Sequence, residues 1–351
     1  MLPSSVSERY FLPGELLSCE PHGNGHIHDS YDVKSTRGRF LLQRFNTHVF
    51  PDVEAVMGNI RRITAYLAED CRARGEDPER RVLSLIPSLS GENYVRDEAE
   101  QVWRMYRFIA DCVNPDKPES SEDCFACGQA FGDFQYRLRD FPAENLAVTI
   151  PDFHNTPKRY QNLLRSAKAD VAGRAKEVTE ELAFFAERES LYGVLEAAHA
   201  RGNLPLRVTH NDAKINNCML DAASRRPLCI LDLDTVMPGY CVNDFGEAVR
   251  TGAVTAAEDA KDPAEVALIP EYCRAYREGF LAGCRGILTE AEIALLPEGL
   301  RLMTLENAIR FLTDYLDGDT YYKIDYPRHN LVRARCQIAL AKSIEAQWEK
   351  L

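Results

Sequence analysis

Hydrophobic and polar residues alternate in two stretches near the start of the chain, which predicts strands with one buried face. The stretches are GHIHDSYDV at 25–33 and RFLLQRFN at 39–46, and the turn between them predicts a hairpin. Apolar residues then recur at helical spacing behind Asp52, a residue type that favours helix N-caps. They are Val53, Val56, Met57, Ile60, Ile63 and Leu67. Further strands are expected at 81–89, 94–96 and 101–109. These elements predict a small sheet with one helix on it.

The pattern becomes helical beyond a polar connector at 114–123. A long periodic stretch at 174–202 predicts one helix, which the glycine at its end closes. Two short strand-and-loop segments follow at 206–220 and 227–239, and helical periodicity resumes at Asp244 and continues nearly to the last residue. The informative chemistry lies in the two short segments.

A β-rich segment followed by a helical one predicts an α+β protein with a two-lobed, protein-kinase-like fold. The small β-rich N-terminal lobe is expected at 1–113 and would bind the nucleotide. The large, mainly helical C-terminal lobe at 114–351 would carry the catalytic loop and the acceptor site. Fold alone assigns no chemistry, so the function must come from particular residues.

Charge and composition exclude several classes of partner. The 351 residues include 42 basic and 54 acidic side chains, a formal net charge of −12, with no block of basic residues. Nucleic-acid binding needs clustered positive charge, so we do not expect it. No apolar run is long enough to span a membrane, and the first residues do not resemble a signal peptide. We expect a cytoplasmic protein, with a monomer as the default state.

The eleven cysteines are scattered and odd in number, which favours reduced thiols over a disulfide framework. Only Cys124 and Cys127 have the C-x-x-C spacing, and no second pair follows at a distance suited to zinc. We interpret them as two semi-buried thiols on one face of a helix.

One loop combines the groups that phosphoryl transfer requires. Asp212 in His210-Asn-Asp matches the carboxylate that accepts the acceptor's proton, and Asn217 matches the magnesium-binding amide five residues later. Lys214 would place a positive charge at the transferred phosphate. Asp232 ends an apolar strand fifteen residues beyond Asn217, where a second Mg²⁺ ligand is expected. The alternative for each isolated Asp is a solvated turn or cap. The joint pattern favours the catalytic interpretation.

The tripeptide Asp244-Phe-Gly spells the D-F-G that protein kinases use for metal binding. It opens a helix here and does not end a strand. We therefore interpret Asp244 as a buried anchor that accepts backbone N–H bonds and, with His210, supports the catalytic loop. Asp232 remains the predicted metal ligand.

The N-terminal lobe offers weaker signals for ATP. Gly23 and Gly25 lie at the entry of the first strand pair, where backbone N–H groups would approach phosphate, but a plain hairpin entry fits equally well. Arg44 on the third strand would pair with the phosphates. Glu54 on the next helix is a possible partner for Arg44, or else a solvent-facing carboxylate.

Longer strings carry a resemblance to a known family. They are HNDAKINNCMLD, ILDLDTVMPGYCVNDFGEAVRTGA, GNGHIHDSYDV, LLQRFNTHVFPD, IPDFHNTPKRY and ENAIRFLTDYLDGDTYYKIDYPRHNLVRARCQ. The sequence resembles the aminoglycoside phosphotransferase and choline kinase superfamily, and within it the N-acetylhexosamine 1-kinase group. The resemblance implies transfer of the γ-phosphoryl of ATP, with Mg²⁺, to the anomeric hydroxyl of GlcNAc or GalNAc. It implies Asp212 as base, Asn217 and Asp232 as metal ligands, and Arg310 and Tyr321 as sugar contacts.

The residues alone leave the acceptor open. Arg310 has donors for sugar oxygens, but it would equally pair with Glu306 one helical turn earlier, with the tyrosines at 321 and 322 filling the core. His154 and Arg159 are candidates for shaping the acceptor site. His28 departs from the smaller polar residue expected there in the family. Choline, an aminoglycoside or another sugar is the alternative acceptor, and a nucleotide-binding pseudokinase is the alternative from another class.

Overall fold

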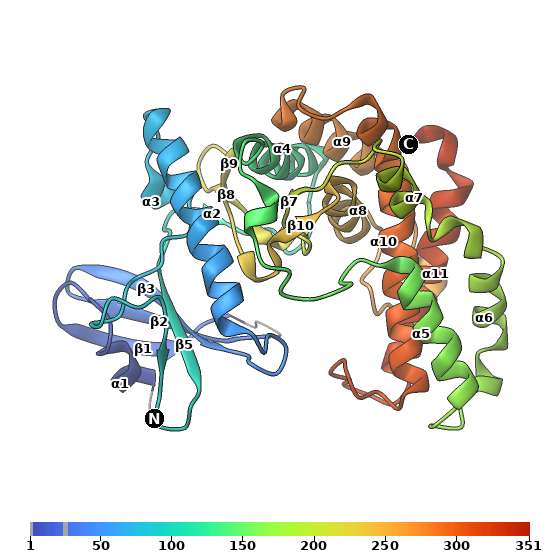
Figure 1. Ribbon diagram of the computed structural model, residues 1–351, viewed down its shortest axis with the longest axis horizontal. Coiled ribbons are helices and arrows are strands. Elements are labelled where there is room, and N and C mark those ends of the chain that lie inside the picture. Colours follow the sequence, from blue (N-terminus) through green and yellow to red (C-terminus); the bar gives the residue numbers. More distant parts are fainter. Residues whose placement is uncertain (1–2, 24–26) are drawn as a thin grey trace. The chain divides into compact units, whose positions relative to one another are not determined.

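The computed structural model describes residues 3–23 and 27–351, and the chain divides into two compact units (Figure 1). The first unit consists of Met1–Val113, Asp140–Ile150 and Met219–Met237. The second consists of Asn114–Arg139, Pro151–Cys218 and Pro238–Leu351. Two segments from later in the sequence thus pack with the N-terminal residues. The assignment of nucleotide binding to residues 1–113 and of catalysis to 114–351 stays a prediction.

The first unit is built on a five-stranded antiparallel sheet in the order β1-β2-β3-β5-β4. Its strands are β1 (Leu16–Pro21), β2 (Asp29–Ser35), β3 (Gly38–Phe45), β4 (Val95–Arg96) and β5 (Val102–Arg107). The predicted hairpin and the strand at 101–109 are confirmed. Two further small sheets, β10-β7 and β6-β8-β9, are formed by β6 (Cys112–Val113), β7 (Arg207–Thr209), β8 (Cys218–Asp221), β9 (Pro227–Ile230) and β10 (Met237–Gly239).

The register of the five-stranded sheet separates its two faces. One face carries a hydrophobic core that includes Val33, Phe40, Leu42, Trp103 and Met105, joined by residues in and after the short helix α1 (Pro3–Ser7). On the opposite face Ser30, Gln43 and Arg104 form a polar row, with the buried Phe45, Val102 and Tyr106 on either side of it. Successive residues of a strand point to opposite faces, so a shift of one position would move Arg104 from this row into the apolar core.

Helix α2 (Val53–Ala73) begins as predicted, because the Asp52 carboxylate accepts a hydrogen bond from the Ala55 amide. Its predicted apolar face is buried. Within this face Asn59 donates to the carbonyls of Ala147 and Val236, at 2.8 and 3.0 Å. The helix therefore holds both later segments of the first unit, including the one that contains Asp232.

The strand predicted at 81–89 is wrong. A short helix, α3 (Pro78–Arg81), is followed by irregular backbone that makes only isolated bridges, Leu85 to Tyr106 and Ser88 to Tyr10. Pro87 has no N–H to donate, so the run of apolar residues cannot continue a ladder. The apolar residues are nevertheless used, since Ile86 belongs to the core of the sheet.

The second unit is mainly helical, as predicted, and the α+β class is confirmed. Its α-helices are α4 (Ser121–Arg137), α5 (Thr156–Ala169), α6 (Thr179–Ala186), α7 (Val194–Ala200), α8 (Cys241–Gly252), α9 (Pro270–Cys284), α10 (Glu290–Leu316) and α11 (His329–Ala346). Short 3₁₀ turns occupy Ala143–Asn145, Ala175–Glu177, Glu189–Leu191, Ile215–Asn217, Leu233–Thr235, Pro263–Glu265 and Trp348–Lys350. Helix α8 begins three residues before the predicted start at Asp244. Among the described helices, none is both long and apolar enough to cross a bilayer.

The single helix predicted at 174–202 is wrong, because two short helices, α6 and α7, replace it. The side chain of Arg188 donates to the Phe184 carbonyl and the Tyr192 hydroxyl to the Phe185 carbonyl. These bonds satisfy carbonyls at the end of α6 and allow the chain to turn before α7. The glycine at 202 does follow the last helical turn, with a φ of +76°.

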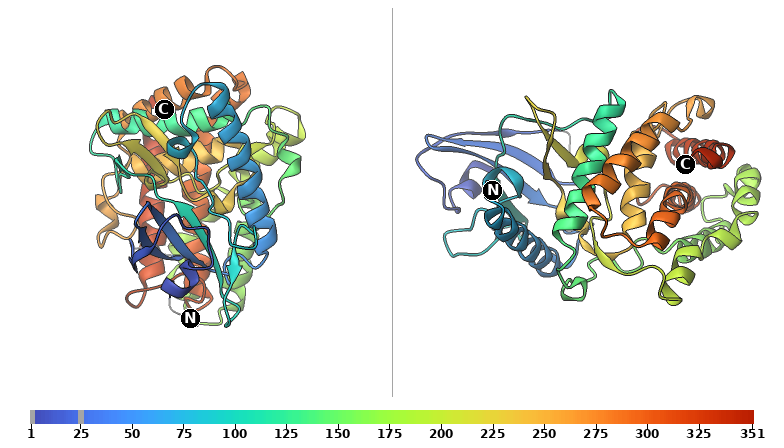
Figure 2. Two further views of the ribbon diagram at one scale, coloured as in Figure 1. Left: turned by 90° about the vertical axis from the view of Figure 1, so that its left-hand side faces the viewer. Right: turned by 90° about the horizontal axis from the view of Figure 1, so that it is seen from above.

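Glycines allow the helices that carry the site to approach closely. A Cβ on Gly246 of α8 would lie 2.3 Å from the Gly299 carbonyl oxygen of α10, and one on Gly299 would lie 2.1 Å from the Val242 carbonyl oxygen. Helices α4 and α9 meet in the same way, and both views of Figure 2 show them side by side. Close backbone packing fixes α8 against α10, and with it the residues that these two helices carry into the site.

Candidate active site

The predicted catalytic loop follows β7 in the second unit, and Asp244 of α8 holds its backbone. The Asp244 carboxylate accepts hydrogen bonds from the amides of His210 and Asn211, at 2.8 and 2.7 Å, and from the Gln135 side chain at 3.2 Å. Asn211 adopts a left-handed backbone conformation with φ of 62°. The hydrogen bonds from the amides of His210 and Asn211 to the Asp244 carboxylate stabilise this conformation. Burial raises the pKa of Asp244, against the opposing effect of His210 and the two amides.

His210 is fully buried and shapes the loop from inside. Its Nδ1 accepts the Asp212 amide at 3.3 Å, and its ring lies edge-on to Phe131, with centroids 5.6 Å apart. Two buried side chains, those of His210 and Asp244, thus contact the backbone of three successive residues.

The Asp212 carboxylate forms an ion pair with Lys214, with 2.9 Å between Oδ1 and Nζ. Burial would raise the pKa of Asp212, but the Lys214 ammonium, with His210 and Arg250, holds it below its ordinary value. The same carboxylate raises the pKa of Lys214. Asp212 is therefore an ionised hydrogen-bond acceptor beside a fixed positive charge.

Asn217 is oriented by the same loop, since its side-chain amide donates to the Asp212 carbonyl at 2.8 Å. This bond uses the nitrogen and leaves the side-chain oxygen for a cation. An amide oxygen is a hard donor of the kind that Mg²⁺ prefers. His210, Asp212, Lys214, Asn217 and Asp244 therefore come together in one loop and its support.

Glu247 and Arg250, which lie about one and two turns beyond Asp244 on α8, were not selected from the sequence. Arg250 pairs with Glu247 at 2.5 Å and with Glu258 at 2.6 Å, and Gln337 accepts a further bond at 3.2 Å. Arg250 contributes to the low pKa of Asp212 and Glu247 to the high pKa of Lys214. Their helical spacing after Asp244 is the only sequence signal that favours them.

His154 links the loop to α10. Its Nε2 donates to the Asn211 carbonyl at 2.8 Å, and its Nδ1 lies 2.9 Å from Glu306. Burial would lower the pKa of His154, but Glu306 and the Asn211 carbonyl outweigh burial and raise it above the ordinary 6.5. Glu306 also accepts from Thr156 at 2.8 Å. The result is a buried imidazolium–carboxylate pair.

This pair predicts a loss of stability at alkaline pH. A histidine whose folded pKa exceeds its unfolded value stabilises fully below about pH 6.5, and the stabilisation declines as pH rises through the folded pKa. We expect the Tm difference between wild type and His154→Gln to shrink between about pH 6 and pH 9. Thermal melts across that range measure it, with His48→Gln, an exposed histidine, as control. A difference independent of pH contradicts the assignment.

The acceptor-side residues lie in the same unit. The Arg310 guanidinium lies 5.5 Å from the Phe153 ring centre and 5.7 Å from that of Tyr322. Among the described residues Arg310 and Glu306 form no direct ion pair, since Glu306 binds His154 and Thr156, although the Glu306 carboxylate still raises the pKa of Arg310. The Tyr321 side chain is 68% exposed, so it does not fill the core.

The first unit contains Asp232, which takes a left-handed conformation with φ of 56° just before a 3₁₀ turn. Two residues later, Asp234 is buried and accepts hydrogen bonds from both terminal nitrogens of Arg104. His28 Nε2 lies 2.7 Å from Asp234, and His28 Nδ1 accepts the Asn46 amide at 3.0 Å. The amide fixes the tautomer, so Nε2 carries the proton and donates to Asp234. His28, the departure noted in the sequence, thus supports the turn after Asp232.

In the N-terminal lobe, the role of Arg44 as a phosphate contact stays a prediction. Arg44 pairs with Asp29 and shares the sheet face of Leu42 and Trp103, opposite to Gln43 and Arg104. Glu54 is not its partner, because Glu54 accepts a hydrogen bond from Tyr94. Arg104, on the opposite face, is a buried cation that the sequence analysis did not select, and it binds Asp234, two residues after Asp232. The available signal was a single arginine inside an otherwise apolar and aromatic stretch, VWRMY.

The glycine prediction is only partly described. Gly23 has a φ of +70° with open space around its α-carbon, and Gly25 lies outside the described residues. Cys124 and Cys127 lie on one helix, α4, as predicted, but they are fully buried and not semi-buried, and burial raises the pKa of Cys124. Within residues 3–23 and 27–351, no cluster of three or more His, Cys, Asp or Glu side chains forms a metal site.

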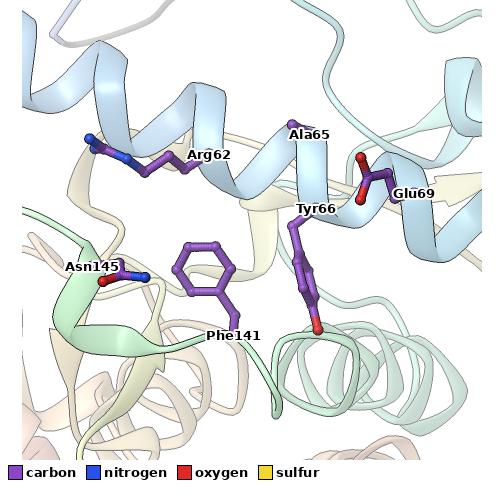
Figure 3. A pocket seen from close by; sticks show the side chains of 6 residues that line it. All are labelled: Arg62, Ala65, Tyr66, Glu69, Phe141 and Asn145. Atoms are coloured by element: carbon purple, nitrogen blue, oxygen red, sulfur yellow. The ribbon is translucent and has the colours of Figure 1, made fainter.

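Two surface grooves contain none of the predicted site residues. One, of about 470 Å³, lies between α2 and the segment after α4 in the first unit (Figure 3) and is lined by Arg62, Ala65, Tyr66, Glu69, Phe141 and Asn145. The other, of about 480 Å³, lies along α5 in the second unit.

Comparison with known proteins identifies the class. A family model described as "Phosphotransferase enzyme family" matches residues 18–286, most of the chain. The chain belongs to this family, the aminoglycoside phosphotransferase and choline kinase-like superfamily that its sequence resembles. It is therefore a small-molecule phosphotransferase.

Solved structures with the same kinase-like fold are only distantly related in sequence. A microcompartment-associated aminopropanol kinase is 16% identical, with a TM-score of 0.66 and coverage of 98% of this chain and 96% of that one. Spectinomycin phosphotransferase, in complex with ADP and spectinomycin, is 13% identical, with a TM-score of 0.59 and coverage of 99% and 97%. Choline kinase from Cryptosporidium parvum is 11% identical, with a TM-score of 0.59 and coverage of 99% and 95%. These likenesses confirm the predicted kinase-like fold.

Proposed function

We propose that this protein is an ATP-dependent N-acetylhexosamine 1-kinase, which phosphorylates the anomeric hydroxyl of GlcNAc or GalNAc. The observation that carries the proposal is the Asp212 carboxylate, kept ionised by Lys214 in a loop that Asp244 fixes. The resemblance across most of the chain supplies the acceptor. The ADP and GDP complexes among the structural neighbours support ATP as the phosphoryl donor.

The reaction is direct in-line transfer. Asp212 accepts a hydrogen bond from the sugar's anomeric hydroxyl, which aligns an oxygen lone pair with the γ-phosphorus. The bond between this oxygen and phosphorus forms as the bond from phosphorus to the ADP oxygen breaks, and the hydroxyl proton passes to Asp212. Lys214 offsets charge on the transferred phosphoryl group.

Asn217 and Asp232 are the residues proposed to hold Mg²⁺. An oriented amide oxygen and a carboxylate suit this ion. When bound, Mg²⁺ would neutralise charge on the nucleotide phosphates. Gly23, Gly25 and Arg44 remain proposed nucleotide contacts, although Arg44 is already paired with Asp29. The cytoplasmic location and the monomeric state also remain predictions.

An acceptor panel tests the function. We expect phosphoryl transfer to GlcNAc and GalNAc, with phosphorus–proton coupling in NMR spectra placing the phosphate on C1. The 1-O-methyl glycoside of GlcNAc is the matched control, because it keeps every group except the reacting hydroxyl and should give no transfer. The highest kcat/KM for choline or kanamycin would overturn the sugar assignment.

The pseudokinase alternative makes a different prediction. A protein that only binds nucleotide would be stabilised by ATP without transferring phosphate to any acceptor. The occupied positions of the catalytic pattern, His210, Asp212, Asn217 and Asp232, favour the enzyme. A thermal shift with ATP and Mg²⁺, run beside the acceptor panel, separates the two possibilities.

A further inference from the structure

Four residues form what we call the basic–aromatic cluster: Phe153, Arg159, Arg310 and Tyr322. The Nε of Arg159 and the hydroxyl of Tyr322 are shielded from solvent and have no hydrogen-bond partner. In the part of the chain that the structure describes, Arg310 contacts aromatic rings but no polar partner. A buried polar group without a partner costs about 1–3 kcal/mol. Two such groups, beside the guanidinium of Arg310, indicate a site that a ligand completes.

The charges of the cluster define the ligand's chemistry. Burial lowers the pKa of Arg159, and the adjacent charge of Arg310 lowers it further. The buried carboxylate nearby, Glu306, is already bound to His154 and Thr156. Two guanidinium groups therefore lack an anionic partner of their own. Such a site repels cations and favours an electron-rich oxygen.

The cluster is joined to the catalytic loop through His154. The His154 ring lies 4.5 Å from that of Phe153, tilted by 49°, and its Nε2 donates to the carbonyl of Asn211, the residue before Asp212. Arg310 lies one turn beyond Glu306 on α10, and Arg159 donates to the Phe153 carbonyl at 2.9 Å. A ligand on this cluster would therefore lie on the acceptor side of Asp212.

We propose that Arg159 and Tyr322 are specificity-determining residues that, together with Arg310, bind an acyl carbonyl or carboxylate oxygen of the acceptor. This rests on the proposed function for the identity of the site as the acceptor site. Arg159 donates through Nε, Tyr322 through its hydroxyl, and the Phe153 ring covers the apolar side of the substituent. The acetamido group of an N-acetylhexosamine has this combination of an oxygen and a methyl group.

The test compares Arg159→Met with Arg165→Met, an exposed arginine on the same helix, as matched control. Steady-state kinetics use five acceptors: GlcNAc, glucose, glucosamine, N-acetylmuramic acid and glucuronic acid. Loss of a hydrogen bond to a charged donor should raise KM for acceptors with an acyl or carboxylate group by about 10- to 100-fold. We expect KM for glucose, KM for ATP and the acceptor-free ATPase rate to stay within about threefold, since Arg159 would not contact these groups.

A second variant guards against misfolding. Tyr322→Phe removes only the unpartnered hydroxyl, so we expect an unchanged or higher Tm together with a KM raised by about 3- to 10-fold for the same acceptors. GlcNAc has an acyl carbonyl but no carboxylate, whereas N-acetylmuramic acid has both. Comparing the change in KM for these two acceptors shows which oxygen the cluster binds. Equal effects of Arg159→Met on GlcNAc and glucose would overturn the proposal.

The two proposals fail separately. If wild type phosphorylates an acidic sugar but no N-acetylhexosamine, the proposed function is wrong, and Arg159→Met still tests the cluster on that acceptor. If wild type prefers glucosamine, a cation, the cluster proposal is wrong. If turnover is too slow for kinetics, acceptor binding is measured by calorimetry in the presence of a non-hydrolysable ATP analogue and Mg²⁺. If the wild type then binds no acceptor, the cluster proposal is also overturned.

Discussion

Asp212→Asn is expected to lower kcat by about 10²- to 10⁴-fold, the usual contribution of a general base. The amide has nearly the same shape but carries no charge and cannot take the acceptor's proton. It also removes the partner of Lys214, which is bound at 2.9 Å in the wild type. ATP binding should remain measurable, because the nucleotide contacts are expected from other residues.

The measurement is single-turnover transfer from labelled ATP, with ATP affinity followed separately by calorimetry. Asp116→Asn, the same chemical change in the exposed connector before α4, is the matched control and should leave both quantities unchanged. Near-wild-type turnover by Asp212→Asn would remove this residue from its assigned role. Loss of ATP binding in parallel with turnover would indicate a structural effect instead.

Local sequence patterns predicted the helices and strands whose conformation depends on residues close to them in the sequence. The hairpin of β2 and β3 follows from alternation, and α2 follows from its apolar spacing and the Asp52 cap. The catalytic loop is also local, since His210 to Asn217 span eight residues. The motif therefore identified residues that the fold brings together within one unit.

Contacts between distant residues could not be predicted in this way. Arg104 and His28 both bind Asp234, although they lie 130 and 206 residues from it in sequence. No periodicity relates such positions. Arg44, which the sequence analysis selected, and Arg104, which it did not, lie on opposite faces of the sheet, and the pattern of one strand does not show this pairing. His28 departs from the family pattern in a position where its two ring nitrogens connect Asn46 to Asp234.

Periodicity also overestimated the continuity of helices. The stretch at 174–202 keeps apolar residues at helical intervals, but the bonds from Arg188 and Tyr192 to carbonyls at the end of α6 break it into pieces. Both bonds come from side chains within seven residues, yet apolar spacing alone does not distinguish a turn from a continued helix. Here the side chains of Arg188 and Tyr192 cap carbonyls at the end of α6, and this capping favours the turn over a continued helix.

Asp244 carries the second large effect, this time on stability. Asp244→Ala leaves the buried amides of His210 and Asn211 without an acceptor, while Gln135 keeps its 3.0 Å bond to the Val208 carbonyl. Two such amides cost about 2–4 kcal/mol together. For a unit of this size, that loss lowers Tm by on the order of 5–10 °C.

Asp244→Asn separates the anchoring role from a metal-binding role of the D-F-G type. Asn keeps one acceptor oxygen but faces the other backbone amide with a donor, so we expect its Tm to lie between those of wild type and Asp244→Ala. Because Asp244 would act through the loop that it holds, kcat should fall in the same order as Tm, while the Mg²⁺ concentration for half-maximal activity stays unchanged. A shift in this concentration without a change in Tm would make Asp244 a metal ligand and displace Asp232 from that role.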